Sequence, residues 1–173
     1  MRSKLVEKPI KMNRAKPQIE KELDVKMSNR GKEFFIEGEA ESEYIAVDIM
    51  DAIDFGFPIP TALQIHKEDL IFERINIKDH AKNNKVEIAK GRVIGSKGKS
   101  LSTLTEVTGF AFEVKEKEVG IIGHPEEMKN VLTGVISIIR GAKHSNVYSF
   151  LQRNKEGPIW DLGLKEGIEK ETD

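Results

Sequence analysis

The chain has 173 residues, of which 33% are charged and 38% hydrophobic, and its formal net charge is −1. This composition fits one or two small globular domains with modest cores. The absence of cysteine excludes disulfides, thiolate metal sites and cysteine nucleophiles, and it fits a reducing compartment. No apolar run approaches the roughly 20 residues of a membrane span, and residues 1–9 lack the apolar stretch of a signal peptide. We therefore expect a cytoplasmic protein that binds no membrane.

Residues 1–67 are predicted to form one small domain. Its expected elements, in chain order, are a short strand at about 3–7, a short helix at about 17–23, a strand at 25–27, a return strand at 33–37, a helix at 41–57 and a short helix at 61–66. The hairpin is indicated by the turn residues that precede its return strand. The long helix is indicated by apolar residues on one face and by Gly56 and Pro58 at its end.

Residues 68–153 are predicted to form a second domain. Its expected elements are a strand at 70–77, a polar loop at 79–85, helices at 86–94 and 98–108, strands at 110–115 and 118–122, and helices at 126–140 and 146–153. Residues 154–173 are acidic and are predicted to be a flexible tail, in which Trp160 is a candidate anchor for a partner protein.

The second domain is organised around Gly95 and Gly98, which flank Ser96 and Lys97. Gly95 is expected to end one helix and Gly98 to open the next. Because glycines carry no side chain, a phosphodiester strand can approach the main chain here, and the first N–H groups of the second helix attract anions. Residues 82–99 hold six lysines and arginines against one acid, so positive charge gathers at the loop although the net charge of the chain is negative.

The two halves of the chain align at an offset of 85 residues. The aligned pairs are Gly38 and Gly123, Gly56 and Gly141, Ile19 and Leu104, Ile36 and Ile121, Ile53 and Ile138, and Leu63 and Tyr148. We therefore expect one α+β fold to be present twice, each copy with the order strand, helix, helix, strand, strand, helix. The offset places residues 10–13, Ile-Lys-Met-Asn, on the glycine loop, so the first copy is predicted to be degenerate and to act as a docking or supporting domain.

The pattern Ile-Gly-x-x-Gly-x-x-Leu-x-x-Leu, which begins at Ile94, resembles the core of a KH domain. The resemblance implies two tandem type I KH-like domains, each a three-stranded sheet with helices packed on one face. It also implies that the second copy clamps about four nucleotides of single-stranded RNA across its GxxG loop. The expected RNA-binding residues are Lys90, Arg92, Val93, Ile94, Gly95, Ser96, Lys97, Gly98, Lys99 and Leu101. Bases would enter a groove beside strand 110–115, with Phe112 or Val114 on its wall.

Two segments, residues 92–99 and 141–151, look like the archaeal relatives of the eukaryotic "partner of Nob" (Krr/Dim-type) ribosome-assembly proteins. The resemblance implies a monomeric factor that binds the 3′ region of small-subunit ribosomal RNA. It further implies that the factor positions or regulates a Nob-type endonuclease, which is its partner, and that the α subunit of translation initiation factor 2 is another partner. No metal or other cofactor is expected.

Several other functions compete with this interpretation. The glycine loop could be a plain helix–helix turn, whereas a nucleotide-phosphate loop is disfavoured because the full P-loop spacing is absent. Asp48, Asp51 and Asp54 stand three apart and could mimic a metal site, but such a set is more often a solvated helix face, so no enzyme is predicted. The alternatives left open are a protein–protein adapter with vestigial KH folds and a KH factor in RNA decay or translation.

Overall fold

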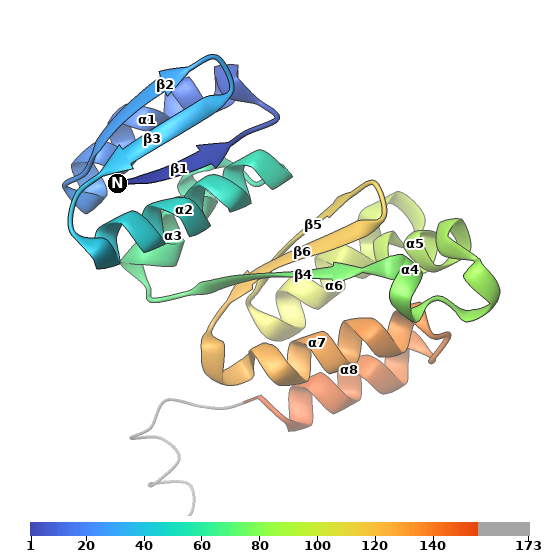
Figure 1. The fold of residues 1–173 in the computed structure, drawn as a ribbon. Coiled ribbons are helices and arrows are strands. Elements are labelled where there is room, and N and C mark those ends of the chain that lie inside the picture. The colour runs from blue at the N-terminus through green and yellow to red at the C-terminus, as the bar shows by residue number, and fades with distance from the viewer. Residues whose placement is uncertain (156–173) are drawn as a thin grey trace, which may run out of the picture.

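The computed structural model describes residues 1–155, and two similar units follow one another along the chain (Figure 1). The elements of the first unit are β1 (Arg2–Leu5), α1 (Pro9–Leu23), β2 (Lys26–Arg30), β3 (Glu33–Glu37), α2 (Ala40–Phe55) and α3 (Ile59–Lys67). Its three strands form an antiparallel sheet in the order β1-β3-β2, and its helices cover one face of that sheet. The acidic tail, with Trp160, lies outside the described residues from residue 156 onward.

The second unit repeats this plan with additional elements. Its elements are β4 (Ile71–Asn76), α4 (Ile77–His80), the 3₁₀ turn η1 (Lys82–Asn84), α5 (Val86–Ile94), the 3₁₀ turn η2 (Ser96–Gly98), α6 (Lys99–Thr108), β5 (Ala111–Lys115), β6 (Glu118–Gly123), α7 (Pro125–Ile139) and α8 (His144–Arg153). The sheet is again antiparallel, in the order β4-β6-β5. The predicted α+β class, with two three-stranded sheets and KH-like units, is confirmed.

The offset of 85 residues holds in three dimensions. It carries β2 onto β5 residue by residue, and α1 and α6 end at equivalent positions, Leu23 and Thr108. Three aligned apolar pairs are fully buried in both units: Ile19 with Leu104, Ile36 with Ile121, and Ile53 with Ile138. The repeat is therefore one packing scheme used twice, because the same positions of the pattern face the core in each copy.

The element order expected for the first unit is wrong, because that unit has one helix where two were predicted. Only residues 6–8 separate β1 from α1, whereas residues 77–98 separate β4 from α6 and include α5 and the glycine loop. The single helix α1 is also longer than predicted. Met12, Ala15 and Ile19 are fully buried along one side of it, so core packing sustains the helix through Pro17, which costs one backbone hydrogen bond.

Smaller differences lie at the boundaries of elements. Strand β2 continues to Arg30 through residues that were predicted to form a turn. Ile77 begins α4 instead of ending β4, and its side chain is fully buried. The predicted polar loop at 79–85 therefore holds the end of α4 and the turn η1, because the apolar anchor at Ile77 and the side-chain cap from Asn76 close a helical turn there.

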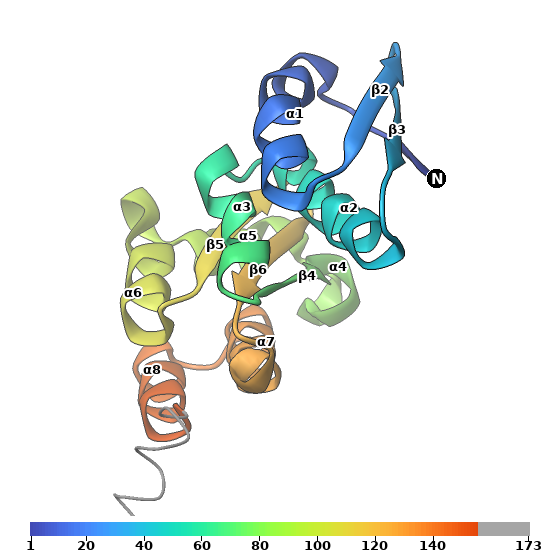
Figure 2. The same ribbon diagram turned by 90° about the vertical axis from the view of Figure 1, so that its left-hand side faces the viewer.

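The two units pack on each other through the face of the second sheet that its own helices leave open (Figure 2). Phe55 and Phe57, from the end of α2 and just after it, each have a ring centroid 5.7 Å from that of Phe72 of β4, and their own centroids lie 6.0 Å apart. Ile122 of β6 belongs to the core of the first unit. Gly120 of β6 allows the close approach, because an added Cβ would lie 2.6 Å from the ring of Phe55.

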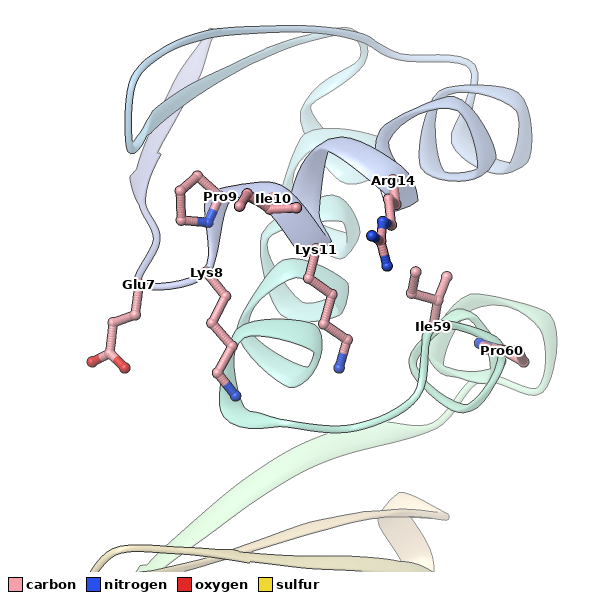
Figure 3. A pocket seen from close by; sticks show the side chains of 8 residues that line it. All are labelled: Glu7, Lys8, Pro9, Ile10, Lys11, Arg14, Ile59 and Pro60. Atoms are coloured by element: carbon pink, nitrogen blue, oxygen red, sulfur yellow. The ribbon is translucent and has the colours of Figure 1, made fainter.

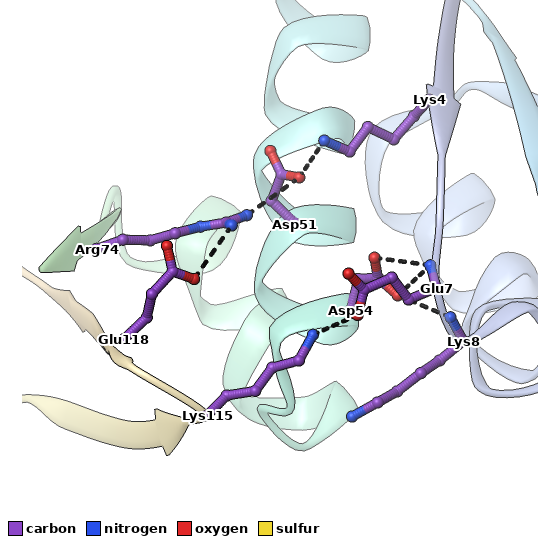
Figure 4. A network of polar contacts seen from close by, with 8 residues as sticks. All are labelled: Lys4, Glu7, Lys8, Asp51, Asp54, Arg74, Lys115 and Glu118. Atoms are coloured by element: carbon purple, nitrogen blue, oxygen red, sulfur yellow. Dashed lines mark hydrogen bonds and ion pairs between the residues drawn. The ribbon is translucent and has the colours of Figure 1, made fainter. Parts of the chain in front are cut away.

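Charged residues of the two units also pair across the interface, and Figure 4 shows these polar contacts. The Arg74 guanidinium lies over the rings of Phe55 and Phe72 and pairs with Asp51 of α2 and Glu118 of β6. Lys115, at the end of β5, forms a 2.6 Å ion pair with Glu7 of the first unit. The interface therefore combines a desolvated aromatic cluster with ion pairs that fix its register. Within residues 1–155, no helix is long and apolar enough to cross a membrane.

Candidate nucleic-acid interface

The glycine loop bends sharply between α5 and α6. Gly95 ends α5 with φ 76° and ψ 172°, and Gly98 begins α6 with φ 75° and ψ 13°. An added Cβ at Gly95 would lie 2.6 Å from the backbone nitrogen of Ser100, so both the conformation and the space require glycine there. At Gly98 an added Cβ would meet open space, so the bare backbone faces outward at this position.

Lysines project from this bare backbone. Lys97 and Lys99 are exposed, and neither forms an ion pair within residues 1–155. Lys97 adopts φ 54° and ψ 30°, a left-handed conformation that is uncommon for a residue with a side chain. The loop therefore offers strained, accessible backbone beside two free cations, an arrangement that suits a phosphate strand.

Helix α8 contacts the residues on both sides of the glycine loop. The ring Nε2–H of His144 donates to the carbonyl oxygen of Arg92 at 2.8 Å, and the hydroxyl groups of Tyr148 and Ser100 lie 3.2 Å apart. Leu63 and Tyr148, which the sequence repeat aligns, lie on the equivalent helices α3 and α8. Only the second unit has a glycine loop, so only Tyr148 can contact one. The RNA-binding residues expected from the sequence included neither His144 nor Tyr148. The only sequence signal for both was the segment 141–151 that carried the family resemblance.

Two expected contacts are corrected by the structure. Arg92 Nε donates to the carbonyl oxygen of Ile138 at 3.0 Å, and its Nη2 donates to that of Ala142, so the guanidinium caps the end of α7 instead of facing the loop. Val93 is fully buried in the core of the second unit and therefore packs under the loop.

The other expected residues fall into two groups by exposure. Ser96, Lys97 and Lys99 are exposed, and Lys90, Ile94, Gly95, Gly98 and Leu101 are half-buried. Phe112 and Val114 of β5 are also half-buried and pack against the second core, as Leu101 does. These three side chains therefore keep part of their apolar surface accessible between α6 and the edge strand β5, which is where the sequence predicted the groove wall.

In the first unit, the start of α1 takes the position that the glycine loop has in the second unit, and a carboxylate of the chain itself lies there. Residues 10–13 lie in the first turns of α1, so no loop precedes that helix. The carboxylate of Asp54 accepts the backbone N–H groups of Glu7 and Lys8 at 2.9–3.0 Å (Figure 4). Because an internal anion already satisfies these two amides, which directly precede α1, they are not available to a phosphate group.

The three aspartates of α2 have separate structural surroundings. Asp51 pairs with Lys4 and Arg74, and Asp54 accepts the amides of Glu7 and Lys8 as described. Asp48 is half-buried, and burial followed by repulsion from Asp51 and Glu73 raises its pKa. Among residues 1–155, no group of three or more histidine or acidic side chains could hold a metal ion.

The repeated sheets, the packing helices and the bare glycine loop together define a tandem type I KH protein. The family model for the second KH domain of PNO1, described as a eukaryotic type KH-domain (KH-domain type I), matches residues 71–156. A KH domain-containing protein of Methanocaldococcus jannaschii is 33% identical over 153 residues, which cover 84% of this chain and 67% of that protein. The chain belongs to the family of archaeal KH-domain ribosome assembly factors of the PNO1/Dim2 type.

More distant relatives agree with this assignment. The RNA-binding protein PNO1 of Oryzias latipes is 27% identical over 106 residues, which cover 60% of this chain and 44% of that protein. A chain in the crystal structure of the a/eIF2alpha–aDim2p–rRNA complex from Pyrococcus horikoshii is 27% identical, with a TM-score of 0.76 over 88% of this chain and 92% of that one. The chain matches less than half the length of the PNO1 protein of Oryzias latipes.

Proposed function

We propose that the chain binds single-stranded RNA from the 3′ region of small-subunit ribosomal RNA, with the Gly95–Gly98 loop as the clamp. The observation that carries this proposal is the open space at Gly98, beside the exposed cations of Lys97 and Lys99, which form no ion pair within the described residues 1–155. Phosphates would lie against the bare backbone, and bases would turn toward Ile94, Leu101 and Val114. The presence of rRNA in the complex of the Pyrococcus relative supports the choice of ligand.

The clamp is expected to show a salt dependence set by its size. A KH loop holds about four nucleotides, and each phosphate of a single strand contributes a slope of about −0.7 in a plot of log affinity against log salt. A slope of roughly −3 follows.

One such clamp gives modest affinity, so further contacts are needed. We propose that two partner proteins, the Nob-type endonuclease and the α subunit of initiation factor 2, bind together with this chain. The second partner is supported by the a/eIF2alpha in the complex of the relative.

The test is fluorescence anisotropy with a labelled RNA that matches the rRNA 3′ end and with a scrambled RNA of the same length. The variant Ser96→Asp/Lys97→Asp places two negative charges on the loop, and we expect it to weaken binding about tenfold or more, equal to ~1.4 kcal/mol. Lys26→Asp/Ser28→Asp on β2 is the matched control, because these residues are exposed and the charge change is the same. Equal affinity of both variants would contradict the assignment of the clamp.

A further inference from the structure

The first unit contains an open cavity of about 620 Å³ at the start of α1 (Figure 3). One side of it is formed by residues 7–11 and Arg14, and the other side by Ile59 and Pro60 at the start of α3. Ile10 exposes 74% of its surface, which is unusual for a side chain of its type. The cavity therefore presents apolar surface that the core of the first unit does not use.

The rim of this cavity is positively charged. Lys8, Lys11 and Arg14 line it, and in the described part of the chain no carboxylate lies within ion-pairing distance of these three side chains. Lys11 Nζ donates to the carbonyl oxygen of Phe57 at 2.8 Å, which holds its ammonium group in the cavity wall. The only acid of the lining, Glu7, already pairs with Lys115.

The cavity lies beside the end of the second unit that carries the glycine loop. Helix α6 starts at that loop, and β5 follows it after a short turn and runs back in the opposite direction (Figure 1). The last residue of β5, Lys115, therefore returns to the loop end of the unit. Its ion pair with Glu7 joins this end directly to the cavity lining (Figure 4). Because β5 is an edge strand that also contributes to the proposed RNA groove, its ion pair with Glu7 brings the cavity close to that groove.

We propose that this cavity binds a second segment of the same single-stranded RNA. The inference rests on the proposed function of the glycine loop. Phosphates would contact Lys8 and Arg14, and a base would lie against the apolar surface of Ile10 and Ile59. An acidic peptide shares the charge requirement, but the position of the cavity beside the glycine-loop end of the second unit favours RNA. The first unit would therefore extend the binding site with side chains, whereas Asp54 occupies the amides of Glu7 and Lys8 that precede α1.

The experiment compares two RNAs on the full chain. One is an RNA of about four nucleotides, which the glycine loop alone can hold, and the other has about 12 nucleotides and can reach both sites. We expect Lys8→Ala/Arg14→Ala to weaken binding of the longer RNA about tenfold and to leave the shorter RNA unchanged. The salt slope for the longer RNA should become shallower by about 1.4, because two phosphate contacts of about 0.7 each are lost.

Lys21→Ala/Lys26→Ala is the matched control, since both lysines are exposed near the other end of α1 and the loss of charge is the same. One outcome would overturn the cavity proposal and leave the clamp intact. In that outcome Ser96→Asp/Lys97→Asp loses binding of both RNAs, whereas Lys8→Ala/Arg14→Ala binds the longer RNA as tightly as the control variant does. Polyglutamate is the probe for an acidic peptide. If Lys8→Ala/Arg14→Ala no longer binds polyglutamate but still binds the longer RNA with unchanged affinity, the cavity is a peptide site and the proposal is overturned.

Discussion

The hydroxyl oxygen of Tyr148 lies 3.2 Å from the hydroxyl oxygen of Ser100, which is nearly buried in the first turn of α6. The contact joins α8, the last helix of the second unit, to the residue against which Gly95 packs. His144 makes a second connection from α8 to the end of α5. Both helices that flank the glycine loop are thus fixed by the same element, which explains how a strained turn keeps one conformation.

The Ser100–Tyr148 contact can be measured with a double-mutant cycle. A part-buried hydrogen bond between neutral groups contributes about 0.5–1.5 kcal/mol, so Tyr148→Phe and Ser100→Ala should each lower the free energy of unfolding by about that amount. The double variant should lose less than the sum, because the two changes remove one bond. Urea unfolding gives the four values, and Tyr44→Phe, at an exposed tyrosine, is the control. Full additivity would show that the two hydroxyl groups do not interact.

The two glycines of the loop should respond differently to alanine. Gly98→Ala places a methyl group in open space at a left-handed conformation, which costs about 1–2 kcal/mol. Gly95→Ala has a positive φ as well, and its methyl group collides with the Ser100 backbone, so we expect a further ~1–3 kcal/mol. Denaturant unfolding checks the difference. RNA affinity should also fall in Gly98→Ala, because the new methyl group covers the outward-facing backbone, and an unchanged affinity would argue against backbone contact there.

Gly120→Ala should disturb the packing of the two units. The added Cβ would lie 2.6 Å from the Phe55 ring and 3.0 Å from the Phe57 ring, and such overpacking costs about 1–3 kcal/mol. We expect a lower melting temperature and a larger radius of gyration by small-angle X-ray scattering. Gly91→Ala is the control, because Gly91 is exposed in α5 with open space around it. A Gly120→Ala variant as stable and compact as Gly91→Ala would show that the sheet face is not tightly covered in solution.

Asp48 gives a prediction about pH. Burial, then Asp51 and Glu73, raise the pKa of its carboxyl group in the folded protein. The folded state therefore holds this proton more tightly than the unfolded state, so the contribution of Asp48 to stability falls as pH rises through the raised pKa. Asp48→Asn should stabilise the chain at pH 7, and the gain should vanish below about pH 4, near the ordinary value for aspartate. Unfolding curves at both pH values test this, with Glu106→Gln, at an exposed acid, as the control. A gain that is equal at both pH values would contradict the role of the charge.

Features that depend on short-range patterns could be predicted from the sequence. The glycine loop, the paired strands and the long helices α2 and α7 follow from turn residues and from apolar residues with a regular period. The repeat also identified buried positions, because Ile36 and Ile121 face the core in both units. Helix α1 was underestimated because Pro17 indicates a helix boundary, whereas packing against the core decides its length.

Features that depend on contacts between distant segments required the three-dimensional structure. Sequence placed Arg92 among the phosphate ligands, but its guanidinium reaches carbonyl groups 46 and 50 residues away at the end of α7. The aromatic contact between Phe55 and Phe72 and the ion pair between Glu7 and Lys115 likewise join segments of both units. Charge and periodicity indicate which side chains are polar or buried, but the burial of a cation and its choice of partner depend on how the repeated units pack together.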